Sequence, residues 1–152
     1  MRSPDIQQDL TITIVANQHD LDIAFEIRRR VFVLEQGFEL ADEYDADDAR
    51  AIHLLVHKAE QSIATARIIP DGEIARIGRV AVLPEYRGAG YGLAITAACE
   101  EVAVERGSKI AQLHSQIQVQ SFYERAGYKT RGDIFDECGW PHITMEKVLS
   151  SR

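Results

Sequence analysis

The feature that most constrains this fold is a glycine-rich turn between an extended segment and a helical one. The turn comprises Arg87, Gly88, Ala89, Gly90, Tyr91 and Gly92. It follows the β-branched stretch 77–84 and precedes an alanine-rich stretch, 93–106, that ends at Gly107. Glycine lets the backbone approach a ligand closely, and unpaired N–H groups at a helix start attract anions. The pattern therefore predicts a strand–turn–helix unit with a candidate phosphate site, or alternatively a tight turn that binds nothing.

Two other phosphate-binding motifs do not fit this turn. A Walker A loop ends in Gly-Lys followed by Ser or Thr, and this turn has no such ending. A dinucleotide fingerprint has the spacing G-x-G-x-x-G, whereas the glycines here follow G-x-G-x-G. A nucleotide-phosphate binder of either class is therefore disfavoured.

Length and composition limit the class of protein. The 152 residues predict one domain over 1–152, and 45% hydrophobic residues are typical of a globular chain. The net charge of −7 argues against nucleic acid as a partner, and no apolar stretch predicts a membrane segment. Cys99 and Cys138 lie far apart without a CxxC motif, so neither a disulfide framework nor a zinc site is predicted. We expect a cytoplasmic protein.

Hydrophobic periodicity predicts an α/β fold with a mixed sheet and helices on its faces. Strands are expected at 10–15, 52–57, 63–69, 73–83, 109–114, 128–130 and 142–148. Helices are expected from Asp20 to about Leu34, at 93–106 and at 121–125. In the first helix, the spacing predicts that Ile23, Ile27, Val31 and Leu34 face the core. Pro70-Asp71-Gly72 predicts a hairpin turn.

Several segments resemble motifs of the GNAT superfamily of N-acyltransferases. The glycine turn begins five residues after the second Val of Val80-x-Val82, as in the family's acyl-CoA loop. The stretch Phe122-Tyr123-Glu124-Arg125-Ala126-Gly127-Tyr128 is similar to the segment after the family's fifth strand. Further pieces resemble the ElaA-like subgroup: Arg29-x-Val31-Phe32-Val33-x-Glu35-Gln36, Asp42-Glu43-x-Asp45, His53-Leu54, Ala66-Arg67-Ile68, Ile77-Gly78-Arg79-Val80 and Gly139-x-x-His142-Ile143-x-Met145. The resemblance implies the GNAT fold and acetyl-CoA as the acetyl donor.

The resemblance also implies roles for particular residues. The turn from Arg87 to Gly92 would hold the CoA pyrophosphate through backbone N–H groups. Val80, Ala81 and Val82 would pair with the pantetheine like an added strand, and an N–H near Val82 would polarise the thioester carbonyl. Gln116 stands where many members carry an Asn that contacts CoA. Tyr123 would protonate the leaving thiolate. The alternatives are a solvated turn arginine, a plain core strand and a core tyrosine.

The general base is less well defined. Some GNAT enzymes use a Glu on the strand before the glycine turn, and this chain has Arg76 there. Glu35, at the end of the first helix, is the first substitute, ahead of Asp45, Glu137 and His142. A solvated helix-end Glu and a water chain to solvent remain the alternatives.

The acidic stretch 42–48 does not fit a calcium loop, because it lacks the required Gly and Glu of an EF-hand. It is interpreted as a solvated loop or as an attraction for a cationic acceptor, with Arg67, Arg76 and Arg79 either pairing with the acids or binding an anionic group. His53, His57 and His114 lack metal-ligand spacing and are interpreted as structural; no metal is predicted. A covalent acyl role for Cys138 is disfavoured.

Together these observations predict an N-acetyltransferase that moves an acetyl group from acetyl-CoA to a primary amine, by direct attack in a ternary complex. The alternative is a CoA-binding sensor or interaction module without catalytic activity. The acceptor, the range of acyl groups and a homodimer are left open by the sequence.

Overall fold

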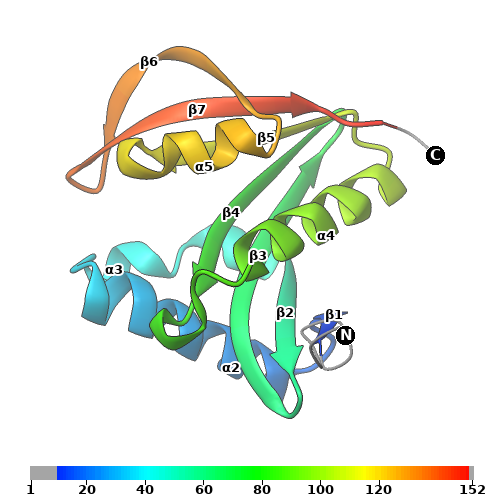
Figure 1. The fold of residues 1–152 in the computed structure, drawn as a ribbon, viewed down its shortest axis with the longest axis vertical. Helices are drawn as coiled ribbons and strands as arrows, with labels where there is room; N and C mark the ends of the chain where they lie inside the picture. The colour runs from blue at the N-terminus through cyan, green and yellow to red at the C-terminus, as the bar shows by residue number, and fades with distance from the viewer. Residues whose placement is uncertain (1–9, 151–152) are drawn as a thin grey trace, which may run out of the picture.

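The computed structural model describes residues 10–150, which build a seven-stranded sheet in the order β1-β2-β3-β4-β5-β7-β6 (Figure 1). Its strands are β1 (Leu10–Ile14), β2 (Ile52–Lys58), β3 (Gln61–Asp71), β4 (Ile74–Val82), β5 (Ile110–Gln116), β6 (Lys129–Glu137) and β7 (Trp140–Val148). The helices are α2 (Gln18–Arg28), α3 (Leu40–Glu43), α4 (Tyr91–Glu105) and α5 (Gln120–Arg125), with a π-helix, η1 (Arg29–Glu35), and three 3₁₀ turns, η2 (Ala46–Ala49), η3 (Pro84–Tyr86) and η4 (Ile117–Val119). The predicted α/β fold with a mixed sheet is confirmed.

The strand directions follow from the connections. β3 and β4 form the predicted hairpin, and β4 and β5 are parallel because α4 joins them across the sheet. All other neighbouring strands pair antiparallel.

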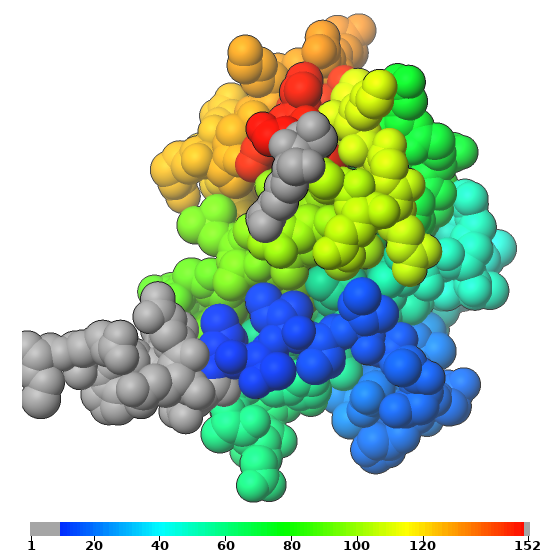
Figure 2. Space-filling view, turned by 90° about the vertical axis from the view of Figure 1, so that its right-hand side faces the viewer, coloured from blue at the N-terminus to red at the C-terminus, as the bar shows by residue number. Residues whose placement is uncertain are grey.

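Helices cover both faces of the sheet. The α4 side chains Ile95 and Cys99 are fully buried in one core cluster with Ile68 of β3 and Ile77 of β4. On the opposite face, α2 and η1 pack against a second cluster that includes Leu55. Figure 2 shows α4 lying across one side of the molecule, with β1 and α2 below it and β6 and β7 above.

The first helix differs from the prediction at both ends. Its cap is Asn17, whose side chain accepts a hydrogen bond from the Asp20 N–H at 2.8 Å; Asp20 lies in the first turn. After Arg28 the chain continues as η1, where the Gln36 N–H bonds to the Val31 carbonyl five residues back. This wider turn changes the phase of the side chains. Val31 is buried, but Leu34, which was predicted to face the core, is 64% exposed.

The last two strands are longer than predicted. β6 was expected at 128–130 but runs to Glu137, through a register shift between Arg131 and Phe135 that includes Gly132 at φ +76°. β7 begins at Trp140 rather than at His142. The polar, largely exposed sequence of β6 carries little strand periodicity, so its pairing with β7 defines it. The extension places Glu137 beside the end of β5.

No helix within residues 10–150 combines the length and the apolar character needed to cross a membrane.

Candidate active site

A cleft of about 950 Å³ opens where β4 and β5 separate. One wall is built by η1, α3 and η2, and the other by the ends of β5, β6 and β7. The start of α4 and the helix α5 also line it. Residues far apart in sequence therefore converge on one concave surface, which is where ligands usually bind.

The separation of β4 from β5 has a local cause. The two strands pair only from Ile74 to Arg76 on the β4 side. Beyond that, β4 carries a bulge, in which Arg79 and Val80 oppose one β3 residue. Arg79 has φ +51°, a left-handed conformation that costs about 1–2 kcal/mol for a residue with a side chain. The bulge bends β4 away, so the backbone of 77–82 has no partner strand on the β5 side.

The glycine turn lies at one end of this opening. Gly88 and Gly90 have φ values of +86° and +89°, which explains why glycine is needed at both positions. α4 begins directly after Gly90, and no side chain caps its first turn. Its N–H groups are therefore available to an anion. A Cβ at Gly92 would lie 3.3 Å from the Phe122 ring, so this glycine allows α4 and α5 to approach.

The other residues of the turn differ in their roles. Tyr91 also lines the cleft, but it is only 3% exposed and packs in the core cluster. Ala89 is exposed and is not part of the cleft lining.

The structure pairs two predicted site residues with each other. The Arg87 guanidinium donates two hydrogen bonds to the Glu35 carboxylate, at 2.6 and 2.7 Å, and a third to the Val82 carbonyl. The hydrogen bond from Arg87 lowers the pKa of Glu35. A carboxylate held in this way is a weaker proton acceptor, and Glu35 does not line the cleft. This geometry speaks against Glu35 as the general base.

Tyr123 lies on α5 and lines the cleft, with 9% of its surface exposed. Its ring packs edge-on against Phe122 and Tyr128, which holds the phenol in one orientation. Burial raises the pKa of Tyr123, so the phenol is protonated at neutral pH. The group is therefore in the protonation state that a general acid requires.

Two contacts bridge the cleft walls. Gln116, at the end of β5, donates a hydrogen bond to the Gln36 side chain at 2.9 Å. The Phe38 ring lies against Trp140, with the centroids 5.6 Å apart. Gln116 thus lines the cleft, and its amide contacts the segment after η1. Gln36 and Phe38 are cleft residues that sequence reasoning did not identify, because only the tertiary contact reveals them.

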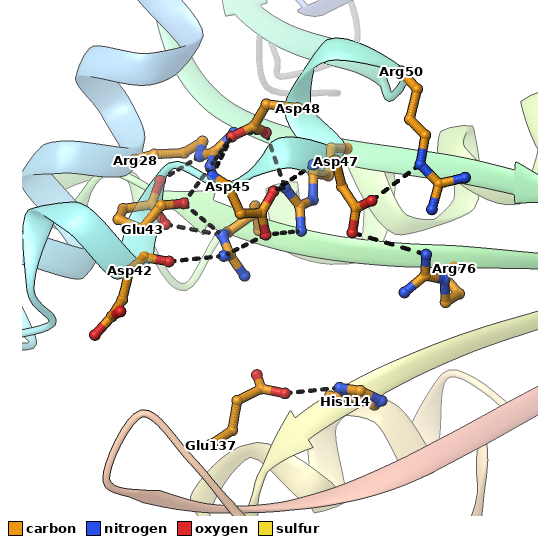
Figure 3. A network of polar contacts seen from close by, with 12 residues as sticks. Arg28, Asp42, Glu43, Asp45, Asp47, Asp48, Arg50, Arg76, His114 and Glu137 are labelled. Atoms are coloured by element: carbon orange, nitrogen blue, oxygen red, sulfur yellow. Dashed lines mark hydrogen bonds and ion pairs between the residues drawn. The ribbon is translucent and has the colours of Figure 1, made fainter.

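The acidic stretch forms a charged network with arginines from three elements (Figure 3). Arg28 of α2 is fully buried and pairs with Glu43 and Asp48. Arg67 of β3 bonds Asp45 and Asp48, and Arg79 of the β4 bulge bonds Glu43 and Asp45. Asp47 faces Arg76 at 3.8 Å. Of the two interpretations of these arginines, pairing with the acids is therefore what the structure shows.

Burial raises the pKa values of these carboxylates, and pairing with arginine lowers them. Burial alone would raise the pKa of Asp48, but hydrogen bonds from Arg28 and Arg67 outweigh it and lower the pKa to about 2. Burial raises the pKa of Glu43, although Arg28 and Arg79 oppose the change. The network is a rigid wall of the cleft and not a solvated loop.

Comparison with known proteins agrees with this geometry. The family model described as an acetyltransferase (GNAT) domain matches residues 32–149. The chain belongs to the GNAT acetyltransferase family. A provisionally assigned acetyltransferase of Bacillus subtilis is 36% identical over 141 residues, which cover 91% of this chain and 96% of the relative.

Two solved structures show the same GNAT fold. A provisionally assigned N-acetyltransferase from Lactobacillus plantarum has a TM-score of 0.87 at 31% identity, covering 93% of this chain and 99% of the other. Escherichia coli ElaA has a TM-score of 0.81 at 28% identity, covering 91% and 99%. The resemblance to ElaA-like GNAT proteins is confirmed.

The GNAT cleft of this chain has two chemically different halves. The half beside α4 offers backbone N–H groups and the buried Tyr123 phenol. The other half carries the charged network on one wall and His114, Glu137 and His142 on the facing wall. Within residues 10–150, no group of three His, Cys, Asp or Glu side chains is arranged to hold a metal ion.

Proposed function

We propose that this GNAT protein transfers an acetyl group from acetyl-CoA to a primary amine by direct attack in a ternary complex. The observation that carries the proposal is the position of the uncapped α4 start beside the unpaired β4 backbone. The first offers N–H groups to a pyrophosphate, and the second offers an edge on which an extended pantetheine can pair. Few other ligands match both features in one cleft.

The cofactor residues follow from this arrangement. The backbone of Arg87 to Gly92 holds the pyrophosphate, and Val80, Ala81 and Val82 supply backbone groups to the pantetheine. A β4 N–H near Val82 polarises the thioester carbonyl and stabilises the developing oxyanion. Gln116 is a further candidate contact to CoA.

Tyr123 is the proposed general acid. The neutral amine nitrogen attacks the thioester carbon, the C–S bond breaks, and the phenol gives its proton to the CoA thiolate. The proton that the nitrogen loses as the amide forms restores the phenol. The raised pKa of Tyr123 keeps that proton in place until the thiolate forms. General-acid catalysis of this kind contributes about 10²–10⁴-fold.

The acceptor half favours a cation. Its lining includes the carboxylates of Asp42, Glu43, Asp45, Asp47 and Glu137 against the guanidinium groups of Arg67, Arg76 and Arg79. The excess of negative charge attracts an amine that arrives as an ammonium. The contacts of Gln36 with Gln116 and of Phe38 with Trp140 join the two cleft walls, and such a joined cleft favours a small acceptor or a single extended side chain.

Thermal unfolding with and without acetyl-CoA tests the cofactor site. Acetyl-CoA, CoA and desulfo-CoA should each raise the melting temperature, because all three carry the pyrophosphate and bind the native state. Gly90→Asp should abolish the increase, since it places a negative side chain against the phosphates. Gly132→Asp is the matched control, because Gly132 also has a positive φ but lies in β6. Unchanged melting of the wild type at millimolar acetyl-CoA would refute the site.

Thiol release with a panel of amines then separates the enzyme from a CoA-binding sensor. The enzyme releases CoA in an amine-dependent manner, and the product carries the acetyl group by mass spectrometry. A sensor binds acetyl-CoA but shows no amine-dependent release with any acceptor class.

A further inference from the structure

The wall opposite the charged network carries a cluster to which the proposed function gives no part in proton transfer: His114 of β5, Glu137 of β6 and His142 of β7. We propose that His114, oriented by Glu137, is the general base that takes the proton from the acceptor ammonium. The inference rests on the proposed function, and it assigns a role to a histidine that the sequence indicated to be structural. Figure 3 shows His114 and Glu137 joined across from the network.

Hydrogen bonding determines which ring nitrogen of His114 is free. The His114 Nδ1 atom lies 2.8 Å from the Glu137 Oε1 atom. The hydrogen bond from His114 lowers the pKa of Glu137, and His142 and Arg79 add to the effect. Glu137 is therefore a carboxylate and can only accept, so Nδ1 must carry the hydrogen. The neutral ring then has its lone pair on Nε2, the nitrogen that can take a proton.

His142 lies on the other side of Glu137. Its Nδ1 lies 2.8 Å from the Trp140 carbonyl, which only accepts, so Nδ1 donates there. The His142 Nε2 atom lies 3.7 Å from the second oxygen of Glu137, which is beyond hydrogen-bond distance. Each carboxylate oxygen thus has one imidazole neighbour, and His142 is 4% exposed. Glu137 is held between a half-exposed ring and a buried one.

Packing on rigid strands limits the motion of both rings. The Phe135 ring lies edge-on to the His114 ring, with the centroids 5.0 Å apart, and is stacked on the His142 ring, with the centroids 6.1 Å apart. The strand register explains why these side chains lie together. His142 of β7 is opposite Gln116 of β5 on one side and Phe135 of β6 on the other. His114 and Glu137 each lie two residues from these partners, and residues two apart in a strand share a face. A base held by strands and a carboxylate has the pre-organisation that proton transfer needs.

His114 lies where a base could reach the ammonium of a bound acceptor. His114, Glu137 and His142 line the same cleft as Tyr123 and the β4 bulge, and the His114 side chain is 41% exposed. The charged groups that line the cleft with His114 come from several elements: Glu137 from β6, His142 from β7, Arg67 from β3, Arg76 and Arg79 from β4, Arg87 from the glycine turn, Arg125 from α5, and Asp42, Glu43, Asp45 and Asp47 from the α3–η2 segment. On β6 and β7, Arg131 pairs with Glu146, which lies two residues from the partner of His114 on β7. The carboxylates in this set draw the ammonium toward the ring.

The proton balance is complete. An ammonium N–H bond breaks and the proton moves to the His114 Nε2 atom, directly or through one water. The freed lone pair attacks the thioester carbon, the C–S bond breaks, and the CoA thiolate takes its proton from Tyr123. The attacking nitrogen loses its second proton as the amide forms, and that proton restores the Tyr123 phenol, directly or through water. The imidazolium returns its proton to solvent through the exposed part of the cleft. Glu137 is a positioning residue that stabilises the imidazolium and is not itself protonated.

The kinetic test compares His114→Gln with wild type on two acceptors. With a strongly basic primary amine, kcat should fall about a hundredfold or more, while the acetyl-CoA Kd is unchanged. With an aryl hydrazine, which is unprotonated at neutral pH, the loss should be much smaller. The increase of kcat/KM with pH that reports the base should disappear in the variant. His19→Gln, an exposed histidine on α2, should behave as wild type. Equal losses on both acceptors, or no loss, would overturn the assignment.

A second measurement does not depend on the acceptor. Imidazole ¹⁵N shifts should show the Nδ1–H tautomer for His114 at neutral pH, and Glu137→Gln should change it while acetyl-CoA still raises the melting temperature. An Nε2–H tautomer in the wild type would exclude the base role whatever the kinetics. If the wild type binds acetyl-CoA but acetylates no amine, the proposed function fails and the base role fails with it; the tautomer then decides only the orientation by Glu137.

Discussion

Arg28 should be among the most sensitive positions for stability. Its guanidinium is fully buried, donates to Glu43 at 2.5 Å and to Asp48 at 2.8 Å, and bonds the Glu43 carbonyl. The group also lies over the Phe25 and Tyr44 rings, at 5.0 and 5.4 Å from their centroids. Arg28→Met keeps much of the apolar volume but removes every donor. The variant therefore leaves two largely buried carboxylates short of a positive charge.

The expected loss of stability in Arg28→Met depends on which arginines still pair with Glu43 and Asp48. Removing one partner of a buried ion pair costs about 3–5 kcal/mol. Glu43 keeps Arg79 at 3.0 Å and Asp48 keeps Arg67 at 2.9 Å, so the lower end, about 3 kcal/mol, is expected. For a chain of this size that corresponds to a fall in melting temperature of roughly 6–12 °C. The loss should shrink from pH 8 to pH 5, because the unpaired carboxylates bind protons more readily in the folded variant.

Urea and thermal unfolding measure the loss, with Arg29→Met as the matched control. Arg29 also pairs bidentately, with Glu26, but both side chains are exposed, so water and salt screen this pair and its loss should change stability little. The acetyl-CoA Kd of Arg28→Met should be unchanged and the acceptor KM should rise, because the network forms the acceptor wall. Equal losses for the two variants would refute the view that the network stabilises the fold through burial.

Three further outcomes are expected. Tyr123→Phe should lower kcat on the order of a hundredfold with an unchanged acetyl-CoA Kd, measured by thiol release and calorimetry; equal turnover would reduce Tyr123 to a packing residue. Glu35→Gln should preserve turnover and tighten acetyl-CoA binding, because Arg87 is freed; a fall in turnover at constant Kd would restore Glu35 as the base. The Asp48 pKa is lowered from 3.8 to about 2, so its stabilisation, roughly 2 kcal/mol, is complete above pH 4 and lost as the pH falls through 2. In acid titrations followed by circular dichroism, Asp48→Asn should lack this loss, and an unchanged acid transition would contradict it.

The cofactor half of the site was readable from the sequence because its determinants are local. A glycine turn, the strand before it and the helix after it occupy one continuous segment, 77–106. Positive φ at Gly88 and Gly90 and a free helix start are properties of that segment alone. The mixed sheet and the parallel pairing of β4 with β5 followed from periodicity and from the helix that connects the strands.

The acceptor half was decided only in three dimensions. Arg28 and Asp48, Arg87 and Glu35, and His114 and Glu137 each come from different elements of the chain, and each pair meets only through tertiary packing. Residue type shows that a carboxylate or imidazole is present, but its partner sets its pKa, its tautomer and its freedom to react. The sequence therefore determined the glycine turn and the helix start that we propose for the CoA pyrophosphate, and the tertiary structure decided which carboxylates pair with arginine and which imidazole nitrogen is left to accept a proton.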